Sequence, residues 1–319
     1  MSKRIVRIGL VQMAMSPDQG ENLAKAARMV GEAGRLGANV VCLPELFATR
    51  YFPSERGRRP VPEGIPGPAT RLLSDAARTA RVVLVGGSVY ERGSGGNYNT
   101  CMTFSETGTM LGKYRKVHLP QDEHYYEHDY FSPGGGYTVV DTTYGRIGTL
   151  VCFDQWYPEA ARVNRLMGAQ ILFYPTAIGW VKGVEPVEGD WKRAWESVQV
   201  GHAVSNSLVV CAVNRVGVEG QTTFWGGSFV SDQFGKLLFR AADDEGVFLA
   251  ECDLGLGARG RRVGIHAEQD EGDVWPAHGI GSGRRRPPPG WATACPPSGM
   301  STKPHGSRGP RTLSHFLSN

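Results

Sequence analysis

Segments with the character of β-strands and α-helices alternate along most of this chain, and a similar order occurs twice. Apolar periodicity separates the two kinds of segment. In the first half, strands are predicted at 5–13, 39–43, 82–89, 98–104 and 109–115, and helices at 21–37 and 68–80. In the second half, strands are predicted at 137–142, 146–152, 169–175, 207–213, 226–232 and 246–252, and helices at 158–167 and 190–205. This pattern predicts an α/β sandwich with two sheets and two similar halves.

Cysteine usage and the start of the chain indicate a compartment. The chain has six cysteines, none of them in a C-x-x-C pair, and several such as Cys42 and Cys211 lie in apolar runs. Buried free thiols in a reducing environment explain this better than disulfides or a zinc site. Residues 1–10 alternate polar and apolar instead of forming a signal peptide, and no run reaches transmembrane length. We therefore expect a cytoplasmic protein that is not bound to a membrane.

The end of the chain differs in composition from the rest. Residues 279–319 hold seven Gly, seven Pro and six Lys or Arg but no Asp or Glu. Such a segment cannot bury enough apolar surface to offset the entropy lost on ordering, so we expect it to be disordered. Without its six basic residues the net charge of +4 becomes −2, which does not indicate a nucleic-acid-binding surface. We predict one folded domain at 1–262 and a Gly/Pro/Arg-rich tail at 263–319.

Cys152 is placed where a nucleophile could act. It follows the apolar strand-like run 146–151 and precedes a helix-like segment that opens at Pro158. A thiol at a strand-to-helix corner points away from the sheet edge and feels the positive end of the helix, which favours the thiolate. Cys152 is therefore a candidate nucleophile whose partners must come from elsewhere in the chain.

Two charged residues stand at comparable strand ends, each close to a proline that stops the strand. Glu45 follows the apolar run 39–43, where a partly desolvated carboxylate could accept a proton from a thiol. Lys116 ends another predicted strand, and its ammonium group could stabilise a thiolate and then a developing oxyanion. Taken singly, a loop glutamate and a solvated lysine are the simpler interpretations. Together with Cys152, they indicate a cysteine-dependent reaction.

Histidines and carboxylates are also frequent just after Lys116. His118 could form a Cys/His pair, but a hydrogen-bonded structural histidine is the simpler interpretation. The histidines and carboxylates of 121–134 do not indicate a zinc site. We predict no metal and no cofactor.

Three separated motifs resemble those of the nitrilase, or carbon-nitrogen hydrolase, superfamily. They are LPELF at 43–47, YRKVHLP at 114–120 and CFDQWYPEAAR at 152–162, and they carry the Glu, Lys and Cys of that superfamily in its order. Segments 125–134, 154–156 and 173–179 are more similar to the N-carbamoylputrescine amidohydrolases than to other branches. The resemblance covers roughly residues 5–262.

The resemblance implies a four-layer α-β-β-α sandwich of two pseudo-symmetric halves, with the active site at the strand ends. It implies Cys152 as nucleophile, Glu45 as the group that moves the proton, and Lys116 with the backbone N–H of Phe153 as stabilisers of the oxyanion. Glu127 falls at the position of a second active-site glutamate and would orient Lys116 or the substrate. Residues expected near the substrate are Trp156, Thr176, Ala177 and Glu185.

The implied reaction is hydrolysis of a non-peptide C–N bond in a linear amide or N-carbamoyl amine, through a thiol-acyl intermediate. Conversion of N-carbamoylputrescine to putrescine, CO2 and NH3, a step of polyamine metabolism, is the preferred prediction. N-carbamoyl amino acids, β-ureidopropionate and ω-amides are alternative substrates. The acidic loop 185–190, between Trp180 and Trp191, could bind a cationic amine tail, or it could simply be solvated.

Two interpretations lie outside this class. A metal-dependent phosphoesterase can also use a two-sheet sandwich, and a hydrolase scaffold can serve as a non-catalytic binding protein. Members of the superfamily usually continue past the last strand with a segment that contacts a second subunit, whereas here 261–266 lead into the tail. We expect a small amide or carbamoyl substrate and a homo-oligomer, with neither nucleic acid nor membrane as partner.

Overall fold

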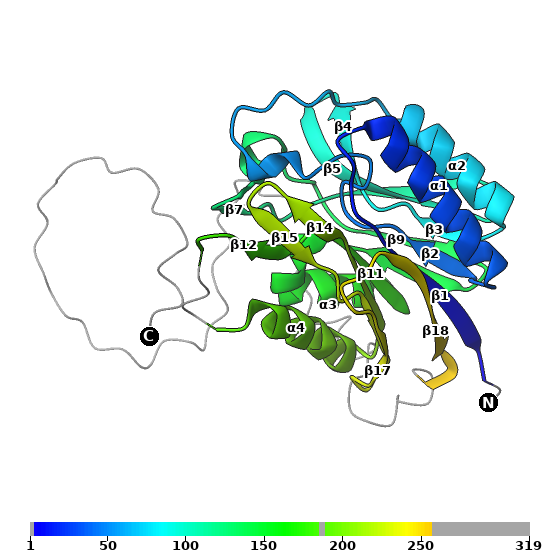
Figure 1. Cartoon of the computed structure of the whole chain (residues 1–319). Coiled ribbons are helices and arrows are strands. Elements are labelled where there is room, and N and C mark those ends of the chain that lie inside the picture. The colour runs from blue at the N-terminus through cyan, green and yellow to red at the C-terminus, as the bar shows by residue number, and fades with distance from the viewer. Residues whose placement is uncertain (1–2, 185–188, 257–319) are drawn as a thin grey trace, which may run out of the picture. The chain divides into compact units, whose positions relative to one another are not determined.

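Two large β-sheets face each other in the part of the chain that the computed structural model describes, residues 3–184 and 189–256 (Figure 1). The first sheet has the order β18-β1-β2-β3-β5-β4, and β6 also pairs with β5. Its strands are β1 (Ile5–Gln12), β2 (Val40–Cys42), β3 (Val83–Val85), β4 (Val89–Gly93), β5 (Gly96–Phe104), β6 (Met110–Arg115) and β18 (Gly246–Asp253). Strands β1, β2 and β3 are parallel, and α1 (Gln19–Arg35) and α2 (Pro68–Ala80) connect them.

The second sheet has the order β17-β16-β13-β11-β10-β9. Its strands are β9 (Thr138–Thr142), β10 (Gly145–Thr149), β11 (Ile171–Thr176), β13 (Val209–Asn214), β16 (Phe229–Ser231) and β17 (Leu237–Arg240). Strands β10, β11 and β13 are parallel, and α3 (Pro158–Leu166) and α4 (Trp191–Asn206) connect them.

The two sheets share one plan. Each has a parallel trio joined by two helices, and an antiparallel strand lies on either side of the trio. These flanking strands are β18 and β5 in the first sheet, and β9 and β16 in the second. The two similar halves predicted from the sequence therefore have the same topology.

Apolar clusters on both faces of the sheets explain why the strand sequences are almost continuously apolar. In β1 the side chains of Ile8 and Leu10 belong to the cluster between the sheets, whereas Val11 belongs to the cluster beneath α1 and α2. Both faces of the sheet are thus covered, as expected for parallel strands. Helices α1 and α2 pack on the first sheet and α4 packs on the second, with α3 beside it (Figure 1). The layers are α-β-β-α, so the predicted fold class is confirmed.

The helices begin where the sequence supplies a cap. The side chain of Asp18 accepts a hydrogen bond from the backbone of Glu21 at the start of α1, and Asp190 does the same for Arg193 at the start of α4. Helices α2 and α3 begin with a proline, whose missing N–H group costs nothing at that position.

The strand predicted at 82–89 is interrupted. It separates into β3 and β4 at Gly86 and Gly87, and Gly87 has a φ of +61°. A Cβ atom on Gly87 would lie 2.2 Å from the carbonyl oxygen of Pro44. The break lets the chain pass closely beside the loop that carries Glu45.

Several short strands were not predicted, because two to four residues give too little periodicity to recognise. They are β7 (Gln121–Asp122), β8 (Tyr125–Tyr126), β12 (Gly179–Val181), β14 (Val216–Glu219), β15 (Thr222–Trp225) and the β17 named above. A hairpin turn at 106–108 joins β5 to β6, and Ser105 and Thr109 pair across it.

The described cysteines are buried free thiols at positions 42, 101, 152, 211 and 252, and Cys295 lies outside the described residues. No helix in 3–184 or 189–256 has the length and apolarity needed to cross a bilayer. The boundary predicted at 262 and the tail also lie outside the described residues.

Candidate active site

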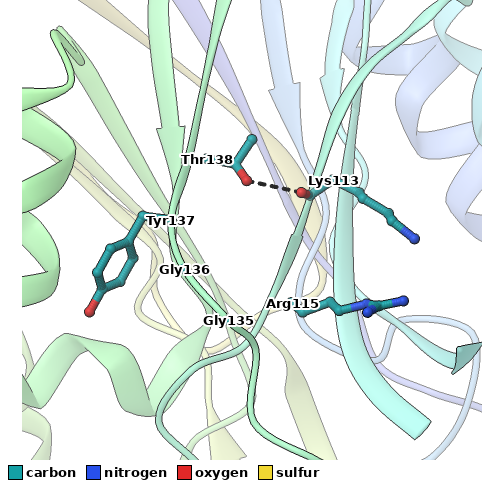
Figure 2. Close-up of a pocket in the computed structure, with 6 residues that line it drawn as sticks. All are labelled: Lys113, Arg115, Gly135, Gly136, Tyr137 and Thr138. Atoms are coloured by element: carbon teal, nitrogen blue, oxygen red, sulfur yellow. Dashed lines mark hydrogen bonds between the residues drawn. The ribbon is translucent and has the colours of Figure 1, made fainter. Parts of the chain in front are cut away.

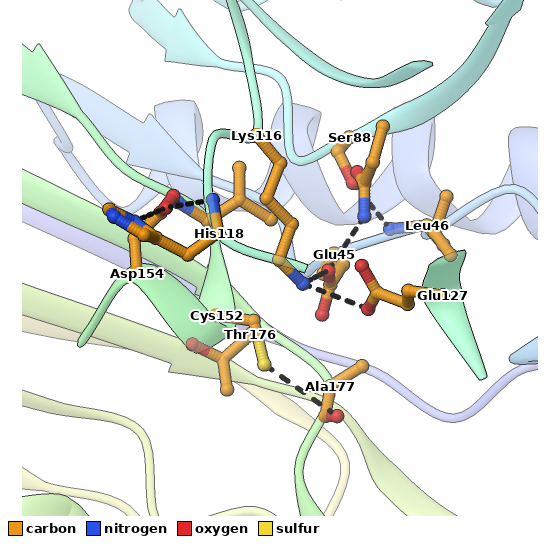
Figure 3. Close-up of polar contacts among 12 residues, drawn as sticks. Glu45, Leu46, Ser88, Lys116, His118, Glu127, Cys152, Asp154, Thr176 and Ala177 are labelled. Atoms are coloured by element: carbon orange, nitrogen blue, oxygen red, sulfur yellow. Dashed lines mark hydrogen bonds and ion pairs between the residues drawn. The ribbon is translucent and has the colours of Figure 1, made fainter. Parts of the chain in front are cut away.

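The site lies beyond the ends of strands from both sheets (Figure 3). Glu45 comes shortly after β2, the middle strand of the first parallel trio, and Cys152 comes shortly after β10, the first strand of the second trio along the chain. Lys116 directly follows β6. The carboxyl ends of parallel strands meet at one edge of a sheet, so the two facing sheets bring these side chains together.

Lys116 is buried between two carboxylates. Its Nζ atom lies 2.8 Å from Oε1 of Glu45 and 2.8 Å from Oε1 of Glu127. All three side chains have an exposed fraction of 0%. Tyr51 donates a hydrogen bond of 2.6 Å to Oε1 of Glu127, and Asn99 donates one of 2.8 Å to Oε1 of Glu45. The ammonium group therefore has a fixed position.

Strand alternation delivers Lys116 into the site. Lys113 and Arg115 line a surface hollow of about 390 Å³ with Gly135, Gly136, Tyr137 and Thr138, and their side chains point away from Tyr137 (Figure 2). Both bind the buried carboxylate of Glu91. Because successive side chains of a strand point to opposite faces, Lys116 turns inward where Arg115 turns outward.

The loop that carries Glu45 is held from its backbone. Leu46 has a φ of +46°, and its N–H group donates to Ser88 Oγ at 2.9 Å. The buried guanidinium of Arg215 donates to the carbonyl oxygens of Glu45 and Leu46 at 2.7 and 2.9 Å. Arg215 is in turn paired with Glu219 at 2.8 Å. This loop cannot move without breaking several buried hydrogen bonds.

Cys152 occupies a tight turn at the start of the 3-10 helix η3 (Cys152–Trp156). Its φ is +43°, which is uncommon for a residue other than glycine and is frequent at functional sites. The Sγ atom lies 3.9 Å from the carbonyl oxygen of Ala177, and the side chain is 5% exposed. In Figure 3 the sulfur points toward the carbonyl oxygen of Ala177. Glu45, Lys116 and Glu127 are close enough to Cys152 to affect the pKa of its thiol.

The electrostatics differ from the sequence expectation of a stabilised thiolate. Burial raises the pKa of Cys152 well above its ordinary value, Glu45 raises it further, and Lys116 opposes the increase. The resting sulfur is therefore a thiol. Burial alone would lower the pKa of Lys116, but Glu127 and Glu45 outweigh burial and raise it, so the lysine is an ammonium ion. Burial also raises the pKa of Glu127, to about 7, with Lys116 opposing and Glu45 adding to the effect.

One oxygen of each carboxylate is left for chemistry. Oε2 of Glu45 and Oε2 of Glu127 are buried and have no hydrogen-bond partner among the described residues. The paired donors on Oε1 of Glu45 fix the direction of its second oxygen. This arrangement can accept a proton, return it and hold negative charge beside an ammonium group.

Of the residues expected near the substrate, some lie next to Cys152 and others do not. Ala177 contacts Cys152 as described, and Thr176 lies next to it at the end of β11, where its hydroxyl donates to the carbonyl of Tyr174. Phe153 directly follows Cys152 in η3, and Trp156 meets Trp191 edge to face at 5.7 Å between ring centroids. Glu185 lies outside the described residues.

Polar side chains of the segment 118–134 bind other parts of the protein. His118 is within hydrogen-bond distance of Asp154, as a structural histidine would be. His124 Nδ1 lies 3.1 Å from the carbonyl oxygen of Ser54, and Asp129 is paired with Arg56. Residues 3–184 and 189–256 contain no group of three or more His, Cys, Asp or Glu that could hold a metal ion.

The sequence did not single out Asn99, Tyr51 or Arg215. Asn99 and Tyr51 each contact one of the two carboxylates, and Arg215 holds the loop of Glu45. Asn99 is an ordinary residue of a predicted strand, and Arg215 follows another. Only strand register and tertiary packing identify them.

Comparisons with known proteins agree with this geometry. The family model described as carbon-nitrogen hydrolase matches residues 7–262. The chain is 36% identical over 265 residues to an N-carbamoylputrescine amidase from Solanum lycopersicum, covering 79% of this chain and 87% of that protein. It is 36% identical over 258 residues to an omega-amidase from Xenopus laevis, covering 78% and 88%. The crystal structure of a carbon-nitrogen hydrolase from Helicobacter pylori G27 is similar, with a TM-score of 0.74, 35% identity and coverage of 81% and 92%. The chain belongs to the carbon-nitrogen hydrolase family, as its three motifs predict.

Proposed function

We propose that this protein hydrolyses a C–N bond in a linear amide or N-carbamoyl amine, with Cys152 as nucleophile. The observation that carries the proposal is the buried ammonium group of Lys116, which is held at 2.8 Å from both Glu45 and Glu127 and is close enough to Cys152 to affect the pKa of its thiol. A buried cation with two carboxylates is costly to assemble for stability alone. Beside a thiol, it forms a site suited to acyl transfer.

In the first step Glu45 accepts the proton of Cys152 through its free Oε2 atom. The Sγ atom attacks the carbonyl carbon of the substrate as the proton leaves. The carbonyl oxygen becomes an oxyanion, which Lys116 and the backbone N–H group of Phe153 stabilise. The raised pKa of Cys152 suits this order, because the thiol loses its proton only when a base is present to accept it.

In the second step the C–N bond breaks. Glu45 returns its proton to the departing nitrogen, and an acyl or carbamoyl group remains on sulfur. Water then attacks this group, Glu45 accepts the proton of the water, and the thiol is restored. For an N-carbamoyl amine, one water is consumed, and the products are the amine, CO2 and NH3.

N-carbamoylputrescine is the substrate that we propose first. The similarity to the amidase from Solanum lycopersicum supports it. Trp180 and Trp191 are half-buried and flank the acidic residues 185–190 in the sequence, and their rings would supply cation–π contacts to an amine tail. The similarity to the omega-amidase from Xenopus laevis favours an ω-amide as the second candidate.

Mass spectrometry after brief exposure to substrate tests the nucleophile. We expect an added carbamoyl or acyl mass on the peptide that contains Cys152, and no added mass on the peptide that contains Cys42. Loss of activity on chelation, with no effect of thiol alkylation, would instead favour a metal-dependent phosphoesterase.

A substrate panel tests the amine preference. Ammonia release is measured with N-carbamoylputrescine, with an ω-amide and with the anionic compounds β-ureidopropionate and an N-carbamoyl amino acid. The proposal requires the highest kcat/KM for N-carbamoylputrescine. Equal or faster turnover of the anionic compounds would refute a site for a cationic tail.

A further inference from the structure

Asp154 joins two parts of the site that are far apart in the sequence. Its Oδ2 atom accepts hydrogen bonds of 2.8 Å from the backbone N–H of Val151 and 2.8 Å from the hydroxyl of Tyr114. Its Oδ1 atom lies 3.0 Å from the backbone nitrogen of His118 and 2.8 Å from Nδ1 of the same residue. The carboxylate is 0% exposed.

The hydrogen-bond partners of Asp154 are close in the sequence to Lys116 and to Cys152. Tyr114 and His118 stand two residues before and two residues after Lys116, and Val151 directly precedes Cys152. The ring of His118 also stacks on Tyr157 at 3.7 Å, just beyond η3. The buried carboxylate of Asp154 therefore connects the turn that carries Cys152 with the segment that carries Lys116 (Figure 3).

We propose that Asp154 is a positioning residue that sets the place of Cys152 relative to Lys116. The proposal rests on the function proposed above. The hydrogen bond from Val151 fixes the residue that directly precedes Cys152, which has the left-handed conformation. The hydrogen bonds from Tyr114 and His118 fix the chain on both sides of Lys116. A small displacement of the sulfur from its partners is enough to slow such a reaction strongly.

Two variants break the same hydrogen bond from opposite sides. Asp154→Asn keeps the shape of the side chain but removes its charge and one acceptor, whereas Tyr114→Phe removes the donor and leaves the charge. Asp232→Asn is the matched control, because Asp232 accepts from the backbone of Phe234 and Lys236 in the turn between β16 and β17.

Steady-state kinetics provide the first readout. We expect kcat to fall about 10- to 100-fold in Asp154→Asn and less in Tyr114→Phe, with little change in KM, because orientation is lost and not binding. The double variant should be little worse than Asp154→Asn alone, because both changes remove one shared interaction. Asp232→Asn should retain wild-type kcat.

Alkylation of Cys152 by iodoacetamide at one fixed pH provides a readout that stability does not affect. Loss of a nearby negative charge alone would favour the thiolate and speed alkylation of Asp154→Asn. Displacement of the sulfur from Lys116 would remove the stabilisation of the thiolate and slow alkylation. We expect slower alkylation in both variants, measured on the Cys152 peptide.

Folded variants with wild-type kcat and unchanged or faster alkylation would overturn the positioning role, whatever their thermal stability. If Asp154→Asn does not fold, wild-type kcat and alkylation in Tyr114→Phe would overturn it. The proposed function fails separately, if wild-type Cys152 forms no adduct with any substrate of the panel. The alkylation comparison would still test the role of Asp154, because it uses no substrate.

Discussion

The raised pKa of Glu127 predicts that the stability of the fold depends on pH, and the substitution Glu127→Gln should remove this dependence. Burial raises this pKa from 4.5 to about 7, since the opposing effect of Lys116 does not offset burial and the neighbouring Glu45. Between these values the native state keeps a proton that the unfolded chain releases. The stability that depends on this proton is complete below pH 4.5 and is lost as the pH rises toward 7.

The size of the effect follows from the difference between the two pKa values. About 2.5 pH units, at about 1.4 kcal/mol for each, give about 3.5 kcal/mol for a fully buried group, and about 3 kcal/mol of this falls between pH 4.5 and pH 8. Glu127→Gln is neutral at every pH and does not undergo this loss. The free energy of unfolding of the variant, minus that of the wild type, should therefore increase by about 3 kcal/mol between pH 4.5 and pH 8.

Urea unfolding of both proteins at half-unit pH intervals measures this difference. Glu91→Gln is the control. Burial alone would raise the pKa of Glu91, but hydrogen bonds from Arg115, Lys113 and Thr100 outweigh burial and lower it to about 2. Its contribution is lost only as the pH falls below 4.5, so this control should show no trend over the same range. A constant difference between Glu127→Gln and wild type would refute the assignment of a raised pKa to Glu127.

Three further changes test the proposed roles. Cys152→Ala should abolish ammonia release, whereas Cys42→Ala, in the core between the sheets, should leave it nearly intact; equal activity would contradict the nucleophile. Lys116→Met should lower kcat by about 100- to 1,000-fold through loss of an oxyanion donor. In urea it should destabilise the fold by about 3–5 kcal/mol, because two buried carboxylates lose their cation. Asn99→Ala should lower kcat by about 10- to 100-fold, because one of two donors that orient Glu45 is lost; an unchanged kcat would show that Lys116 alone orients it.

The sequence predicts the frame of the site because each motif residue stands at the end of an element. Glu45 and Cys152 follow parallel strands, and Lys116 follows an edge strand, so recognition of the strands also locates the side chains. An α/β sandwich with two sheets could be predicted for the same reason, whereas the family and the four-layer architecture were implied by the resemblance of the three motifs. Periodicity shows where strands end, and parallel strands that are joined by helices end on one side of a sheet.

The remaining contacts depend on register and packing, which no local pattern encodes. Asn99 faces Glu45 because β5 and β6 pair with Thr100 opposite Arg115, which sets the carbonyl of Asn99 against the N–H group of Lys116. A shift of one residue would turn the Asn99 side chain to the other face of the sheet. For Cys152, burial and the negative charge of Glu45 outweigh the stabilisation of a thiolate by Lys116, and burial cannot be read from the sequence.

A cysteine with a raised pKa is consistent with nucleophilic catalysis when the charge of the whole pocket is considered. Glu45 and Lys116 carry opposite charges, and Glu127 adds a negative charge only where the pH exceeds about 7. A preformed thiolate would add one more negative charge to a buried site, which is costly. Transfer of the thiol proton to Glu45 leaves the total charge unchanged, because the charge lost by the carboxylate appears on sulfur beside the ammonium group of Lys116. Burial therefore couples attack to proton transfer, and the same burial strengthens the stabilisation that Lys116 gives to the oxyanion.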